Sequence, residues 1–159
     1  MGLFPIASFD TIELGRANQL LVAWEHKMGP VRRPMGLALC HALFHGAEPV
    51  AITVTSDLVR ETVGGAAWLT RENCIELSRV CAVRPGLCRV VLRMWRELVF
   101  PALDAPCAIS YQDAVLHTGN LYRNDGWQRI AFSHSGTDAR SGRKGRDKYI
   151  WLWPRREAA

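Results

Sequence analysis

The middle of the chain alternates between segments typical of strands and of helices. NCIELSRVCAV (73–83) and PCAISYQ (106–112) are short, largely apolar runs, as in buried strands. Between them, Pro85-Gly86 opens a helix. The apolar face of this helix, with spacings of three and four, consists of Leu87, Val91, Met94 and Leu98. A strand–helix–strand unit joins parallel strands through a right-handed crossover, so this region constrains the chain to an α/β fold.

The segments on either side of this unit extend the predicted sheet. Residues 10–28 are predicted as a helix that Gly29-Pro30 ends, because apolar residues recur there at steps of three and four. The other predicted elements are a strand hairpin (35–46 and 49–57), a loop at Gly64-Gly65 in a mixed stretch (58–72), a short helix that ends near Asn124, and strands at 126–134 and 149–154. The predicted fold class is therefore α/β, with a mixed, mostly antiparallel sheet, a central parallel strand–helix–strand unit and helices on both faces.

The chain has 159 residues, which is enough for one domain with a core and too few for two. No repeat or low-complexity linker divides it, so a single domain over residues 1–159 is predicted. No apolar run approaches the roughly 18 residues of a membrane helix, and no membrane partner is expected. A homodimer is left open, because nothing in the sequence decides between one copy and two.

The five cysteines are an odd number without a Cys-x-x-Cys pair, and most have apolar neighbours. This pattern is typical of reduced, buried thiols, so a cytoplasmic location is expected. His26, Asp113 and His117 have a spacing that matches no strong metal motif, and no metal site is predicted.

The net charge of +5 comes from the end of the chain. Residues 1–128 contain 12 Lys/Arg and 12 Asp/Glu, whereas residues 129–159 contain 8 Lys/Arg and 3 Asp/Glu. A basic, partly flexible segment (135–148) is typical of a contact with a polyanion such as DNA, although a solvated loop would have the same composition. The candidate DNA contacts are Arg140, Arg143, Lys144, Arg146 and Lys148.

Polar side chains gather where the two parallel strands end. Ligands bind at such strand ends in α/β proteins. A carboxylate and a phenol can serve there as base and acid in transfer to an amine, because the nitrogen loses a proton and a leaving thiolate gains one. Asp113 and Tyr122 are the candidates for these two roles. The other candidate residues near this edge are Arg79, Arg84, Ser110, Tyr111 and His117.

Each main candidate also has a structural interpretation. Asp113 would cap the helix that follows it, and Tyr122 would be a core residue. Arg79 lies in an otherwise apolar strand, so it needs an acidic partner or a phosphate. A salt bridge from Arg79 to Glu76 or Asp113 and a contact with a ligand both remain open.

Two stretches resemble a known superfamily. Tyr122-Arg-Asn-Asp-Gly126-Trp127, together with Glu76-Leu-Ser-Arg79-Val in the strand before the long helix, is similar to GCN5-related N-acetyltransferases (GNAT). Within that superfamily the chain most resembles the Mom group of phage DNA-modification proteins, through ELSRVC (76–81), SYQD (110–113) and HTGNLY (117–122) in the same order and with similar spacing. The similarity covers residues 35–132 and is strongest over 73–127. It implies a GNAT fold, in which two parallel strands splay apart around an acyl-CoA.

The resemblance also implies roles for individual residues. Tyr122 matches the tyrosine that protonates the leaving thiolate, and Arg79, Asp113 and Tyr122 match the functional set of the Mom group. An acyl donor, acetyl-CoA or a related thioester, is expected against Val80, Cys81, Arg84, Gly86, Arg89 and Tyr122. GNAT proteins cradle pyrophosphate in an Arg/Gln-x-x-Gly-x-Gly/Ala loop. This chain instead has Arg84-Pro-Gly-Leu-Cys-Arg89 with a single glycine, and the donor is left open.

These observations favour an enzyme that transfers a small acyl-type group to an exocyclic amine of a nucleobase in DNA, with adenine favoured by the resemblance, and so protects DNA from restriction. Asp113 would deprotonate or orient the amine, Tyr122 would be the general acid, and Arg79 would hold the charge of the active site. Two alternatives remain. One is a small-molecule or protein N-acetyltransferase that uses acetyl-CoA, and the other is a non-catalytic nucleic-acid-binding protein.

Overall fold

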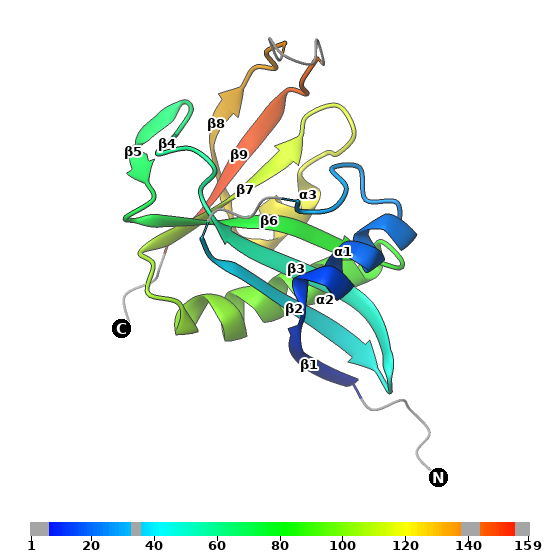
Figure 1. Cartoon of the computed structure of the whole chain (residues 1–159). Coiled ribbons are helices and arrows are strands. Elements are labelled where there is room, and N and C mark those ends of the chain that lie inside the picture. Colours follow the sequence, from blue (N-terminus) through cyan, green and yellow to red (C-terminus); the bar gives the residue numbers. More distant parts are fainter. Residues whose placement is uncertain (1–6, 33–35, 138–143, 155–159) are drawn as a thin grey trace.

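A mixed sheet organises the structure (Figure 1). The computed structural model describes residues 7–32, 36–137 and 144–154. In these ranges the sheet has seven strands: β1 (Ala7–Ile12), β2 (Ala38–His45), β3 (Glu48–Asp57), β6 (Cys74–Ala82), β7 (Cys107–Asp113), β8 (Gln128–Ser133) and β9 (Lys148–Pro154). Their order is β1-β2-β3-β6-β7-β9-β8. β6 and β7 are parallel and the other neighbours are antiparallel, which confirms the predicted sheet.

Helices cover both faces of the sheet, as predicted. α1 (Leu14–Ala23) buries Ala17, Leu20 and Leu21 against β2, β3 and β6. On the opposite face, α2 (Gly86–Met94) continues into a π-helical turn, η1 (Trp95–Val99), and a 3-10 turn, η2 (Phe100–Ala102). α3 (Asn120–Asp125) packs beside this long helix, around a core that includes Trp95 and Trp127. Within the described ranges, no helix has the length and apolar character needed to cross a membrane.

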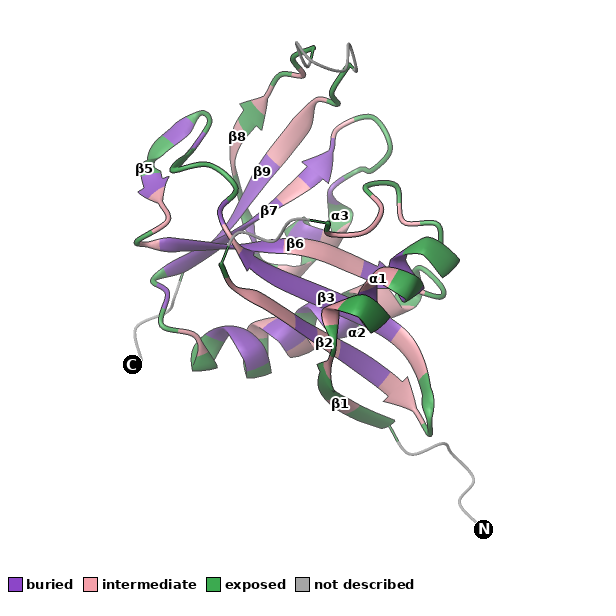
Figure 2. Ribbon diagram, viewed as in Figure 1, coloured by how far each residue is buried: buried purple, intermediate pink, exposed green. Residues whose placement is uncertain are grey.

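The predicted helix over residues 10–28 is wrong at both ends. Residues 10–12 belong to β1, which pairs with β2 at the edge of the sheet. β1 is exposed over most of its length (green in Figure 2), so it lacks the apolar alternation that marks a half-buried strand. At the other end, α1 stops at Ala23, and Met28 continues the helical spacing without lying on the buried face.

The end of α1 stores backbone strain at Glu25. The N–H of His26 donates to the carbonyl of Leu21, and the N–H of Glu25 donates to that of Val22, which is the Schellman arrangement. This arrangement places Glu25 at φ 53°, where glycine is normally found.

We therefore expect Glu25→Gly to stabilise the protein. Relief of the left-handed backbone is worth about 1–2 kcal/mol, and the added freedom of glycine in the unfolded chain offsets part of it, which leaves about 0.5–1 kcal/mol. Thermal unfolding measures the change. Ala23→Gly, two residues earlier in the helix, is the matched control and should lower the melting temperature instead. An equal loss of stability in both variants would contradict the assignment of strain to Glu25.

Other predicted elements agree with the structure to within a few residues. The hairpin of β2 and β3 and the strands β6, β7, β8 and β9 lie where the sequence predicted them. The described part of the predicted strand 35–46 begins at Ala38, since residues 33–35 lie outside the described ranges. The mixed stretch 58–72 forms a small hairpin around Gly64-Gly65, with strands β4 (Thr62–Val63) and β5 (Ala66–Thr70).

β6 and β7 pair along a short part of their length and then separate. The pairing covers Cys74–Glu76 on β6 and 107–109 on β7, after which the two strands fan apart (Figure 1). β6 also carries a bulge against β3, because Leu77 pairs with Thr55 and Arg79 with Val54, which leaves Ser78 between them. The Ser78 hydroxyl donates to the Val54 carbonyl, 3.1 Å away, and holds the bulge. The sheet thus opens into a fork immediately after its parallel pair.

Candidate functional site

A cavity of about 590 Å³ occupies the fork. Six segments form its walls: the loop after α1, the part of β6 beyond the bulge, the start of α2, the end of β7, the start of α3 with the loop before it, and the segment before β9. The predicted site residues that line it are Arg79, Val80, Cys81, Arg84, Arg89, Ser110, Tyr111, Asp113, His117, Tyr122 and Arg146. Residues that are far apart in the sequence are therefore brought around one space.

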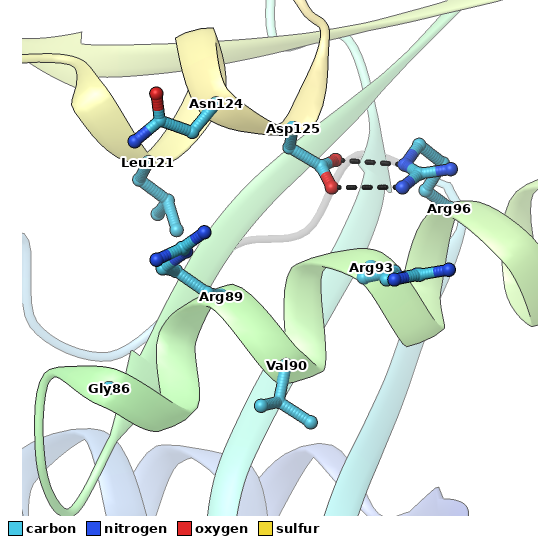
Figure 3. A pocket seen from close by; sticks show the side chains of 8 residues that line it. All are labelled: Gly86, Arg89, Val90, Arg93, Arg96, Leu121, Asn124 and Asp125. Carbon is cyan, nitrogen blue, oxygen red and sulfur yellow. Dashed lines mark hydrogen bonds and ion pairs between the residues drawn. The ribbon is translucent and has the colours of Figure 1, made fainter.

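A second cavity of about 390 Å³ lies between α2 and α3 (Figure 3). Arg89 lines both cavities, and Gly86 and Arg93 line the second. At its far end, Arg96 donates from Nε and Nη2 to the two carboxylate oxygens of Asp125, at 2.9 and 3.0 Å (Figure 3). Because Arg96 is paired in this way, the cationic groups that face the open space are Arg89 and Arg93, and the second of these also bonds Glu97.

Tyr122 lies at the apex of the fork. Its hydroxyl is 2.8 Å from Oγ of Ser110 on β7, and Ser110 donates its own proton to the carbonyl of Leu77 on β6, 2.9 Å away. Since the serine hydroxyl has a single proton, the tyrosine hydroxyl is the donor in the bond between them. Burial raises the pKa of Tyr122 to about 12, against the opposing effect of the Ser110 hydrogen bond. Tyr122 therefore holds a proton at neutral pH, at the point where the strands part.

The HTG stretch explains how Tyr122 reaches this position. Gly119 has φ 78° and precedes α3 directly. A Cβ there would lie 2.5 Å from Oε1 of Gln112 and 2.7 Å from Trp151, so only glycine fits. Gln112 in turn accepts from Trp151 Nε1 and donates to the carbonyl of His117, at 2.8 and 2.6 Å. These two hydrogen bonds of Gln112 fix the loop between β7 and α3, so that the side chain of Tyr122 points back toward β7.

Asp113 is bound within its own loop. Its Oδ1 accepts the backbone N–H groups of Val115 and Leu116 at 3.0 and 2.9 Å, and its Oδ2 accepts from Arg146 at 3.3 Å. Burial opposes the charged form, but these donors outweigh it, so the pKa of Asp113 lies below its ordinary value. A carboxylate held in this way orients neighbouring groups well and takes up a proton poorly.

Arg79 makes no salt bridge to either predicted partner within the described residues. Its Nε donates to the carbonyl of Gly29 at 2.9 Å, and its Nη1 donates to that of Ser78 at 2.7 Å. Arg79 thereby ties the loop after α1 to the bulge of β6. The salt bridge left open by the sequence is absent from the described ranges, because no carboxylate oxygen there lies within 4.0 Å of the guanidinium.

His26 lines the same cavity as Asp113 and His117, although their spacing in the sequence matched no strong motif. Burial lowers the pKa of His26 to about 4, and the charge of Arg79 and the nearby His117 act in the same direction. Its Nδ1 accepts the N–H of Met28 at 3.3 Å. The imidazole of His26 is therefore uncharged at physiological pH where it lines the cavity.

Glu76 is the functional candidate that sequence reasoning missed. It is 7% exposed, it is cross-strand from Ile109, and no hydrogen bond to its carboxylate occurs within the described residues. Burial raises its pKa to about 7, although Arg79 and Lys148 both act to lower it. The signal was present as a single acid in the apolar run Cys-Ile-Glu-Leu. Glu76 does not line the cavity. It lies on β6 just before the bulge at Ser78, and the bulge lines the cavity.

The basic segment is described in part. Arg146 reaches the cavity, whereas Lys148 lies on β9 with its ammonium 5.6 Å from the centre of the Tyr111 ring. Lys144 is exposed and pairs with Thr137 in an isolated bridge. Arg140 and Arg143 lie outside the described residues. In the described ranges, no cluster of three or more His, Cys, Asp or Glu side chains is arranged to hold a metal ion.

Solved acetyltransferase structures have the same fold. NAA60 of Arabidopsis thaliana, in complex with a bisubstrate analogue, is similar with a TM-score of 0.67 and 11% identity, over 95% of this chain and 100% of that one. The ribosomal-protein-S18-alanine N-acetyltransferase of Escherichia coli gives 0.64 and 15%, over 97% of each chain. The aminoglycoside acetyltransferase AAC(6')-Ib, in complex with coenzyme A, gives 0.62 and 12%, over 94% and 95%. No family model matches the sequence, and no curated protein sequence matches it.

These likenesses confirm the predicted GNAT fold. At sequence identities of 11 to 15%, the likeness shows the architecture alone. The reaction and its substrates have to be inferred from the chemistry of the site. The structural likeness carries no support for the finer resemblance to phage DNA-modification proteins.

Proposed function

We propose that this protein is an acyltransferase that moves an acyl group from a coenzyme A thioester to an amine. The observation that carries the proposal is the protonated Tyr122 hydroxyl at the apex of the fork, inside a cavity that ends in arginines. A thioester donor would supply the acyl group and leave as a thiolate. Structures of the same fold have been solved with acetyl-CoA and with coenzyme A, which supports this choice of donor.

The residues present fit such a donor. Arg84 and Arg89 line the end of the cavity next to α2, and no side chain caps the first turn of that helix. The positive end of the helix dipole and these two guanidinium groups would hold phosphates. Arg93, in the adjoining cavity, extends this cationic path along α2. Together they offset the single glycine of the Arg84–Arg89 loop, which is one fewer than the superfamily pattern has.

Two protons have to move during the transfer. Tyr122 Oη holds the proton for the leaving sulfur, because a phenol with a pKa of about 12 is protonated at neutral pH. Glu76, with a pKa near 7, would take the proton of the attacking nitrogen through a bridging water, since its carboxylate lies behind the cavity wall. We assign Asp113 an orienting role: its carboxylate holds the loop between β7 and α3, and the acceptor amine would bind next to it.

We propose a nucleobase amine in DNA as the acceptor, with adenine preferred. The excess of positive charge in residues 129–159 supports this assignment, and Arg146 connects that segment to the cavity. The resemblance of the ELSRVC, SYQD and HTGNLY stretches to the Mom group supports it as well. An exocyclic amine is inaccessible within a duplex, so the enzyme would act on a flipped base or a single strand.

An amine on a protein or a small molecule is the second candidate acceptor. The similar enzymes named above act, by their names, on the alanine of a ribosomal protein and on aminoglycosides. This chain shares the fold of those enzymes. The acceptors named for them belong to those proteins and only show that the fold can serve such amines.

Nucleoside mass spectrometry of total DNA from bacteria that express the protein tests the proposal. We expect one nucleoside with an added acyl mass, and we expect it to be absent from cells that express Tyr122→Phe. Unmodified DNA, combined with release of coenzyme A when small amines or peptides are added to the purified protein, would favour the second acceptor. Neither product, with DNA binding retained, would mean a non-catalytic binding protein and would refute the acyltransferase.

A further inference from the structure

We propose that Arg79 binds a phosphate group of the acceptor, so that the substrate is a phosphorylated amine of the nucleotide class. This inference rests on the acyltransferase function proposed above and narrows its acceptor. The starting observation is a guanidinium that lines the cavity and has no carboxylate partner among the described residues.

The hydrogen bonds of Arg79 leave donors free. A guanidinium has five N–H groups, and the two that are used go to the carbonyls of Gly29 and Ser78. Backbone carbonyls fix the orientation of the side chain and supply no compensating charge. The remaining N–H groups have no acceptor in the described part of the chain, and the residue is only partly accessible to water. A partly buried charge with free donors of this kind is stabilised by an anion.

The neighbouring acids do not supply that anion. The carboxylate of Asp113 is taken up by two backbone N–H groups and by Arg146. Glu76, on the same strand, attracts Arg79 through space, but its carboxylate lies more than 4.0 Å from the guanidinium and occupies none of its N–H groups. Glu25 lines the cavity with its side chain exposed and forms no ion pair within the described ranges.

Positive residues from three separate segments favour phosphate over carboxylate. Lys27 from the loop after α1, Arg79 from β6 and Arg146 from the segment before β9 all line the cavity, and Arg146 also bonds Asp113. A carboxylate is planar and is satisfied by one bidentate arginine, whereas the oxygens of a phosphate accept donors from several sides. The donor phosphates assigned above would occupy Arg84 and Arg89 at the other end, next to α2.

Inorganic phosphate is the first probe. At constant ionic strength and about 100 times its dissociation constant, we expect phosphate to raise the melting temperature of the wild-type protein by about 5–11 °C. Arg16→Gln, an exposed arginine of α1, is the matched control and should keep the full shift. With coenzyme A present at saturation to fill the site next to α2, Arg89→Gln should keep most of the shift, and Arg79→Gln should lose it. Loss in Arg89→Gln with retention in Arg79→Gln would place the phosphate beside α2 and overturn the proposal.

Arg79→Lys guards against a variant that fails to fold. Lysine keeps the charge but lacks the planar fork that binds the two carbonyls and a phosphate in a fixed geometry, so an intermediate shift is expected. A full shift in Arg79→Lys and in Arg79→Gln alike, or no shift in the wild-type protein, would refute the site.

Acceptor kinetics are the second probe. With acetyl-CoA as donor, we expect kcat/KM for deoxyadenosine monophosphate to exceed that for deoxyadenosine by at least about tenfold, and Arg79→Gln to abolish this ratio. If neither compound is acylated while phosphate still binds through Arg79, the adenine acceptor fails and the anion site stands. If both are acylated at equal rates by the wild-type protein, the anion site fails and the acyltransferase stands.

Discussion

Tyr122→Phe is expected to lower kcat for acyl transfer by about 10²–10⁴-fold, the usual contribution of a positioned general acid. The physical reason is that the thiolate would leave without the proton that the Tyr122 hydroxyl holds in the cavity. The substitution removes one buried hydrogen bond, to Ser110, which contributes about 1 kcal/mol to stability. The ring remains stacked on Trp151, with the ring centres 5.7 Å apart, so the fold should survive.

Release of coenzyme A, followed with a thiol reagent under saturating donor, measures the effect on Tyr122→Phe. The matched control is Tyr149→Phe on β9, whose ring contacts Arg129 and does not line the cavity. This control should keep kcat within about twofold. If Tyr122→Phe does the same, the hydroxyl only joins α3 to β7, and the proton comes from elsewhere.

Glu76→Gln is expected to lower kcat by about 10²-fold or more and to remove its pH dependence near neutrality. In the wild-type protein, the carboxylate is the active form of the base, so kcat should rise with pH through about 7 and then level off. The glutamine variant cannot take up a proton and should show a low, flat profile over the same range. Rates measured from pH 5.5 to 8.5 distinguish the two profiles.

The same substitution should make the protein more stable above pH 7. The pKa of Glu76 is raised on folding, so the folded state favours the protonated carboxyl. Its contribution is complete below the unfolded pKa of about 4.5 and is lost as the pH rises through about 7. Glutamine stays neutral, so at pH 8.5 the variant should be more stable than the wild type by roughly 1–3 kcal/mol, and near pH 4 the two should agree.

Thermal unfolding at both pH values measures this difference. Glu72→Gln, an exposed acid in the turn before β6, is the matched control and should change neither activity nor melting temperature. A lower melting temperature for Glu76→Gln at pH 8.5 would contradict the assignment, because it would mean that Arg79 and Lys148 stabilise an ionised Glu76.

Local patterns predicted most of the sheet because each pattern reflects burial on one side. The strands β6 and β7 and the helix between them are apolar with the expected periods, and their parallel pairing follows from the crossover. β1 was missed because an edge strand exposed on both sides has no such period. Trp24 and Met28 follow Leu21 at the spacing of a helix, so the sequence extended the predicted helix to residue 28. In the structure, the chain leaves the helix at Glu25, before Met28 is reached.

The candidate site was predictable in its members and only partly in their roles. Tyr122 and its neighbours stood out as polar groups around a strand end, and the structure gathers most of them around one cavity. Glu76 did not stand out as a base, because its raised pKa arises from burial beneath other segments, which outweighs the opposing charges of Arg79 and Lys148. Asp113 left two interpretations open, and the donors around it favour the orienting role over the basic one.

By itself, the sequence determined the α/β architecture, the place of the parallel pair and the residue types at its ends, because period and composition act over neighbouring residues. The tertiary structure alone decided which charges are paired. Asp113 found its partners in Arg146 and its own loop, and Arg79 bonds two carbonyls without a carboxylate in the described ranges. Such pairing depends on contacts between segments 30 to 50 residues apart, at distances of a few ångströms that no local pattern encodes.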